Sequence, residues 1–161
     1  MIACPLFAEK IEDMFVMRHS PEGVLFFIRP NTFFSADKKS EFSFDITHLN
    51  TTDTASVKMT VYESSLINVD SVAILCDGAR YLCHTPMSIY KEREKKHWVH
   101  RCDCVFPFKD VKLAMIADEA PTFVVYTNKS TLSYTLPLNN WKKLHPHFCD
   151  IFMMIDESKR K

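Results

Sequence analysis

The sequence predicts a mainly β domain, all-β or α+β, built as an antiparallel β-sandwich or barrel of about seven to eight strands with a short helix near each terminus. Several segments alternate apolar and polar residues with a period of two, which is typical of half-buried strands. The two segments with helical periodicity lie near the chain ends. A parallel α/β fold is disfavoured, because its helices would alternate with its strands.

The length and the apolar content indicate a single domain over residues 1–161. A chain of 161 residues, 47% of them hydrophobic, has enough material for one core and is short for two domains. The charged end of the chain, 156–161, is expected to be a solvated tail.

The first half of the chain predicts one helix and three strands. Residues 6–18 place apolar side chains at steps of three and four, which favours a short amphipathic helix. Segment 24–30 is apolar and β-branched on both faces and is expected to be a buried strand. Segments 42–47 and 57–62 alternate and predict half-buried strands.

Asp77-Gly78 is the strongest local signal. Two apolar runs flank it, and this dipeptide favours a type I′ turn, in which both central residues need positive φ. The turn fixes the expected register of the hairpin. In that register, Cys76 lies opposite Ala79, Ile74 opposite Tyr81, and Val72 opposite Cys83.

The second half begins with a polar stretch, 85–96, that predicts a protruding connection or a short helical turn. Alternation returns over 98–106, and an extended segment is expected over 108–115. Segments 123–127 and 131–136 predict a hairpin in which Asn128 takes the left-handed conformation. The segment over 138–155 favours a helix that breaks at Pro146.

Composition excludes several classes of function. Gly23 and Gly78 are the two glycines of the chain, too few for phosphate-cradling loops, dinucleotide fingerprints or nucleophile elbows. Because 20 Lys and Arg balance 20 Asp and Glu, a site for a polyanion has to be a local patch.

Location is inferred from what the sequence lacks. No apolar run resembles a secretion signal or approaches the length of a membrane span. We therefore expect an intracellular protein, cytoplasmic or nuclear, whose six cysteines are free thiols.

Cysteines and histidines cluster at 83–84, 97–104 and 145–149, which raises zinc binding and a cysteine nucleophile as hypotheses. Cys102-Asp103-Cys104 has a one-residue spacer, whereas structural zinc knuckles use two to four. The apolar neighbours of these cysteines oppose a reactive thiolate. We expect core cysteines, with no catalytic residue, no metal and no cofactor.

Bulky apolar residues favour a non-enzymatic protein-interaction module or a subunit of a larger assembly, with a protein partner or a homo-oligomer. Methionine, phenylalanine and tryptophan are enriched in interface cores. The excess of such residues lies at the two ends of the chain. The predicted partner-binding residues are Phe148, Ile151, Phe152, Met153, Met154, Phe7 and Phe15. The alternative is that the helix expected over 138–155 packs on the chain's own sheet.

The alternative function is binding of a polyanion, either single-stranded nucleic acid or the phosphoinositides of an anionic lipid surface, through residues 91–101. Clustered lysine and arginine bind phosphate, and aromatic side chains stack on unpaired bases. Glu92 and Glu94 dilute the cluster to about three net positive charges. The residues predicted for this site are Lys91, Arg93, Lys95, Lys96, Arg101 and Trp98. Against this, charge runs are often solvated loops, with Trp98 then in the core.

Overall fold

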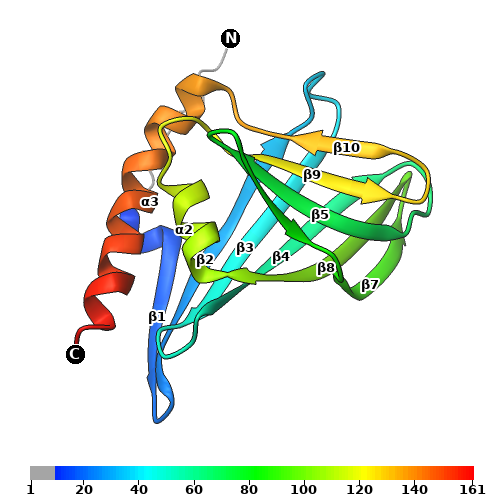
Figure 1. Cartoon of the computed structure of the whole chain (residues 1–161). Helices are drawn as coiled ribbons and strands as arrows, with labels where there is room; N and C mark the ends of the chain where they lie inside the picture. The colour runs from blue at the N-terminus through cyan, green and yellow to red at the C-terminus, as the bar shows by residue number, and fades with distance from the viewer. Residues whose placement is uncertain (1–9) are drawn as a thin grey trace.

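The computed structural model describes residues 10–161, which form two antiparallel sheets and three helices (Figure 1). One sheet has six strands in the order β1-β2-β3-β4-β8-β7, and the other has four in the order β10-β9-β5-β6. The strands are β1 (Phe15–Ser20), β2 (Gly23–Phe34), β3 (Glu41–Leu49), β4 (Thr54–Glu63), β5 (Val69–Cys76), β6 (Ala79–Cys83), β7 (Met87–Glu94), β8 (His97–Pro107), β9 (Thr122–Thr127) and β10 (Thr131–Tyr134). The mainly β class is confirmed, with ten strands in this part of the chain rather than seven to eight.

The core lies between the two sheets. Alternate side chains of β3, β4 and β8 point inward and are buried, as the period of two predicts. At its centre Phe123 of β9 meets Phe33, Phe42 and Phe44 of the large sheet, with ring centroids 4.7 to 5.6 Å apart. This aromatic cluster joins the sheets.

Helix α3 (Leu138–Ser158) lies against one end of the sandwich, beside helix α2 (Phe108–Met115) (Figure 1). The predicted break at Pro146 is wrong, because the helix continues through it. Proline removes one backbone hydrogen bond, but Trp141 and Phe148 on either side are both fully buried and hold the helix in place. The helix also includes 156–158, the first half of the expected tail, and Asp156 forms an ion pair with Lys112 of α2.

The predicted N-terminal helix over 6–18 is only partly confirmed in its described residues, 10–18, because the second half of these forms a strand. Helix α1 spans only Ile11–Met14, and β1 then pairs along its whole length with β2. Backbone pairing with a neighbouring strand has outweighed the helical spacing of the apolar side chains. Residues 1–9 lie outside the described part of the chain.

Two further segments differ from their predictions. The polar connection expected over 85–96 contains edge strand β7. Its side chains are all exposed, so the sequence shows no apolar face that would have predicted a strand. The expected extended segment 108–115 is helix α2, in which Phe108, Val111, Ala114 and Met115 are buried at helical spacing.

The first hairpin is confirmed in type and register. Asp77 and Gly78 have φ values of 49° and 75°, and the three expected residue pairs are those of the β5–β6 ladder. The second hairpin turns differently. Asn128 is not among the residues with positive φ; instead, the Thr127 hydroxyl oxygen accepts hydrogen bonds from the backbone N–H groups of Lys129 and Ser130.

Replacing Gly78 with valine is expected to lower the free energy of unfolding by about 1 kcal/mol or more, because a β-branched residue resists positive φ. A Cβ at this position would meet nothing within 4 Å, so the cost is conformational rather than steric. Urea denaturation measures it. Gly78→Asn is the matched control, since asparagine tolerates this conformation; equal stability of both variants would contradict the turn geometry.

Candidate functional site

The candidate site lies at the end of the sandwich away from α3, where the β7–β8 and β9–β10 turns approach each other (Figure 1). The connection from β4 to β5 runs between them. Asn68 of that connection exchanges two hydrogen bonds with Asn128 of the β9–β10 turn, at 2.9 and 3.1 Å. These bonds hold the start of β5 against the β9–β10 turn.

The register of β7 and β8 separates the charges of the hairpin. Lys91 pairs with His100 and Arg93 with Trp98, so these four side chains share the face directed toward β5. Glu92 and Glu94 alternate with the cations and lie on the opposite face. We call the face of Lys91, Arg93, Trp98 and His100 the basic face, and the glutamates do not dilute it.

Further cations border the basic face. Lys95 and Lys96 form the exposed β7–β8 turn, in which Lys95 has a φ of 50°. Lys129 comes from the β9–β10 turn, and its Nζ lies 3.4 Å from the Ser65 hydroxyl. The Nζ of Lys91 donates a 2.5 Å hydrogen bond to Oδ1 of Asn68. Lysines from both sheets therefore converge on segment 65–68.

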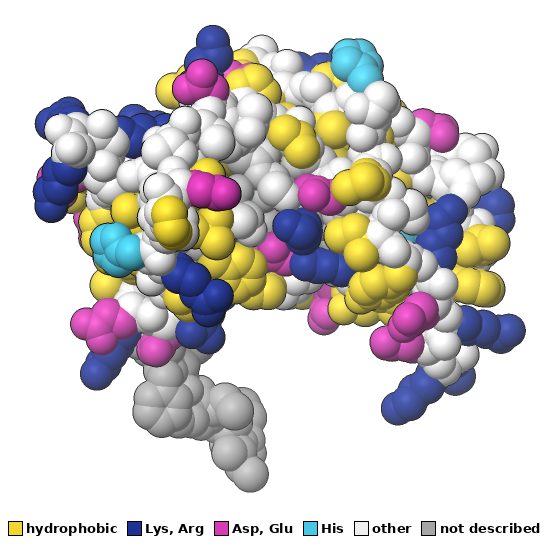
Figure 2. Space-filling view, turned by 90° about the horizontal axis from the view of Figure 1, so that it is seen from below, with side chains coloured by type: hydrophobic (Ala, Val, Ile, Leu, Met, Phe, Trp, Pro, Cys, Tyr) yellow, Lys and Arg dark blue, Asp and Glu magenta, His cyan; other side chains and the backbone are white. Residues whose placement is uncertain are grey.

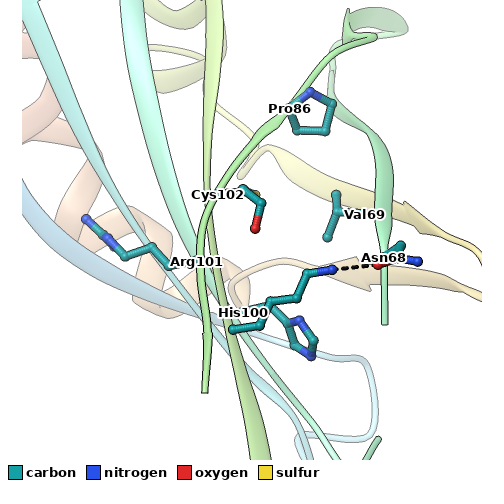
Figure 3. A pocket seen from close by; sticks show the side chains of 8 residues that line it. Asn68, Val69, Pro86, His100, Arg101 and Cys102 are labelled. Carbon is teal, nitrogen blue, oxygen red and sulfur yellow. Dashed lines mark hydrogen bonds between the residues drawn. The ribbon is translucent and has the colours of Figure 1, made fainter. Parts of the chain in front are cut away.

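A cavity of about 110 Å³ lies between the basic face and the start of β5 (Figure 3). Its wall is formed by Asn68, Val69, Pro86, Ser88, Lys91, His100, Arg101 and Cys102. His100 is only 2% exposed, and among the described residues neither ring nitrogen has a hydrogen-bond partner. Burial lowers the pKa of His100; the nearby Ser65 backbone acts in the opposite direction, and the Lys91 ammonium adds to the lowering.

Arg101 was predicted as part of the polyanion site and is not available to it. Its side chain points away from Asn68 and Val69, to the other side of β8 (Figure 3). There it forms a 2.6 Å ion pair with the buried Asp45 and donates a hydrogen bond to Thr60. Trp98 is half-buried. The sequence had left two options for this side chain, full burial in the core or exposure for stacking on a base, and the structure lies between them.

The six predicted partner-binding residues that lie within 10–161 do not form one apolar surface. Phe148, Ile151 and Phe152 are at most 1% exposed and belong to the chain's own core, a correction of the sequence-based prediction. Met153 is 55% exposed, whereas Met154 and, on β1, Phe15 are half-buried. Phe7 lies outside the described residues. Figure 2 shows the face seen from below, where lysine and arginine side chains lie on the protruding parts. In the middle of that face, acidic and basic side chains lie among apolar ones.

The five described cysteines are free thiols. Contact with Cys104 lowers the pKa of the Cys102 thiol; contact with Cys102, followed by burial, raises that of Cys104. Within residues 10–161, no group of three or more histidine, cysteine, aspartate or glutamate side chains is placed to hold a metal ion. Both cysteines point into the core.

In comparisons with known proteins, no family model, no curated protein and no solved structure matches the chain. No helix in the described part of the chain is long and apolar enough to cross a membrane. Sequence reasoning missed Ser88, a residue of β7 outside the basic run, and also Asn68 and Lys129, which the folded chain brings to the hairpin.

Proposed function

We propose that the protein is a binding module that takes up single-stranded nucleic acid on the basic face of the β7–β8 hairpin. The observation that carries this proposal is the register that sets Lys91, Arg93 and Trp98 on one face and both glutamates on the other. Lysine and arginine attract the phosphate backbone, and a neighbouring aromatic ring stacks on an unpaired base. The face needs no catalytic group for this role.

The position of the apolar side chains favours nucleic acid over a lipid surface. Trp98 lies on the flank of the hairpin rather than at its tip, and the tip consists of Lys95 and Lys96. A membrane-binding loop buries apolar side chains among the acyl chains in addition to its cations. This turn offers charge alone, whereas the flank offers an aromatic surface beside cations.

Fluorescence anisotropy with labelled oligothymidylate tests the proposal. Lys91→Gln combined with Arg93→Gln is expected to weaken binding at low salt at least about tenfold, because two phosphate contacts are lost. The slope of log affinity against log salt should become shallower by about 1.4. Both side chains are exposed, so the variant is expected to remain folded.

Glu92→Gln combined with Glu94→Gln is the matched control, since it changes the same strand on the opposite face. This variant should bind at least as tightly as the unchanged protein. Equal affinity of the Lys91/Arg93 variant and the unchanged protein, or no binding at low salt, would refute the proposal. Stronger binding to phosphatidylcholine vesicles that contain phosphatidylinositol bisphosphate would assign the face to membranes instead.

A protein-interaction module is the second candidate, and it is favoured by edge strand β7. The strand has an unpaired backbone edge, and Met87 and Ile89 are 64% and 45% exposed. Two copies of β7 paired antiparallel about an axis normal to the sheet would oppose like charges, such as Lys91 and Arg93. The edge therefore suits an extended segment of another protein, which would protect β7 amides from hydrogen exchange on binding.

A further inference from the structure

We infer that the cavity beside the basic face is a binding site for a terminal phosphate group, a phosphate monoester, of the ligand that this face holds. The inference rests on the proposed function and deepens it. The cavity lies between the Lys91 flank of the hairpin and the start of β5, so it continues the basic face inward. A ligand that follows the cations toward Lys91 reaches it.

The cavity wall combines hydrogen-bond donors with positive charge. Ser88 lies opposite Cys102 and Lys91 opposite His100 in the β7–β8 ladder, which sets all four on the face that borders the cavity. Asn68 adds a side-chain amide from the opposite sheet, and none of the lining residues is acidic. Such a set of donors suits a phosphate, whose oxygens accept several hydrogen bonds at once.

His100 indicates that the site is incomplete without an anion. A buried polar group normally has a partner, and one left without any destabilises the fold. Both nitrogens of this ring are fully buried and unpartnered within the described residues. Because both nitrogens are closed to solvent in this structure, an anion in the cavity would bond to the ring after a small movement of the His100 side chain, and its charge would favour the protonated form.

The size of the cavity suits a phosphate group. A volume of about 110 Å³ corresponds to about four water molecules in the liquid, which accommodates a phosphate. A monoester carries close to two negative charges and has three unsubstituted oxygens. A diester continues as a chain on both sides, so we assign the end of the ligand to the cavity and its remainder to the basic face.

Two oligothymidylates of equal length, one with a 5′-phosphate and one with a 5′-hydroxyl, test the inference. The phosphorylated oligonucleotide is expected to bind about tenfold more tightly, because it adds charge-assisted hydrogen bonds. Ser88→Ala should reduce that preference and leave the affinity for the hydroxyl form unchanged. His100→Gln should also reduce the preference. Ser88 is exposed on an edge strand, so its variant remains informative if His100→Gln does not fold.

Lys142→Gln changes an exposed lysine of α3, far from the cavity, and should retain the full preference, which controls for an effect of overall charge. Equal affinity of the two oligonucleotides would overturn the phosphate site while leaving the proposed function intact. If neither oligonucleotide binds, inorganic phosphate and inositol trisphosphate are titrated against the unchanged protein and the Ser88→Ala variant. If either probe binds and Ser88→Ala weakens that binding, the phosphate site is supported without nucleic acid, and the probe identifies the kind of phosphate ligand. If neither probe binds, both proposals are overturned.

Discussion

Replacing Phe123 with alanine is expected to lower the free energy of unfolding by about 3 to 5 kcal/mol, as is usual for a buried phenylalanine. The side chain is fully buried, and its ring centroid lies 4.7 Å from that of Phe44 and 5.0 Å from that of Phe42. It is the contribution of β9 to a cluster that includes Phe33, Phe42 and Phe44 of the large sheet. Its removal leaves a cavity between the two sheets and weakens their packing.

Urea denaturation followed by circular dichroism measures this loss. Phe123→Leu is the matched control and should cost roughly 1.5 kcal/mol or less, since leucine keeps most of the apolar contact. If the alanine variant lost less than about 1 kcal/mol, the contact between the sheets at this point would be wrong. A uniform weakening of both variants by the same large amount would instead indicate that the shape of the ring is essential.

The parts of the fold that were predictable from sequence are those in which local pattern and tertiary burial agree. Segments 42–47 and 57–62 alternate because one face of β3 and one face of β4 are buried, and the pattern records that directly. The Asp77-Gly78 turn fixes its own register because the two strands are adjacent in the chain. Both predictions needed no knowledge of distant segments.

The missed elements are those in which tertiary pairing decides the conformation. Strand β7 has no buried face, so its stability comes from backbone pairing with β8, which leaves no apolar pattern. Strand β1 exists because β2 offers it an edge to pair with, although residues 6–18 also fit a helix. Helix α2 is eight residues long, and a run of that length is ambiguous between helix and strand.

The candidate site was predictable only where it lies within one hairpin. Lys91 and Arg93 were found because they are close in sequence, whereas Lys129 and Asn68 reach the same face through the packing of the second sheet. Arg101 could have been excluded from the sequence, because strand parity sets it on the opposite face from Trp98. The alternation of Lys91-Glu92-Arg93-Glu94 was likewise a strand signal, and it already separates the charges.

Replacing Arg101 with methionine is expected to cost about 3 to 5 kcal/mol of unfolding free energy, because it leaves the buried Asp45 carboxylate without its partner. Asp45 is 2% exposed on the outer face of the large sheet, and its Oδ1 has no hydrogen-bond partner among the described residues. The Arg101 guanidinium is the group that compensates its charge, at 2.6 Å. Urea denaturation measures the loss.

The double variant Asp45→Asn with Arg101→Met separates the lost pair from the uncompensated charge. Removing both charges should recover much of the stability lost in Arg101→Met, because replacing a whole buried pair is far less costly than breaking it. An Arg101→Met variant that lost less than about 1 kcal/mol would show that Asp45 is solvated. Because Arg101 lies on the opposite face from Lys91, the folded double variant should bind oligothymidylate like the unchanged protein, apart from a small long-range effect of charge. A large loss of affinity in that variant would mean that nucleic acid binds the outer face of the sheet rather than the basic face.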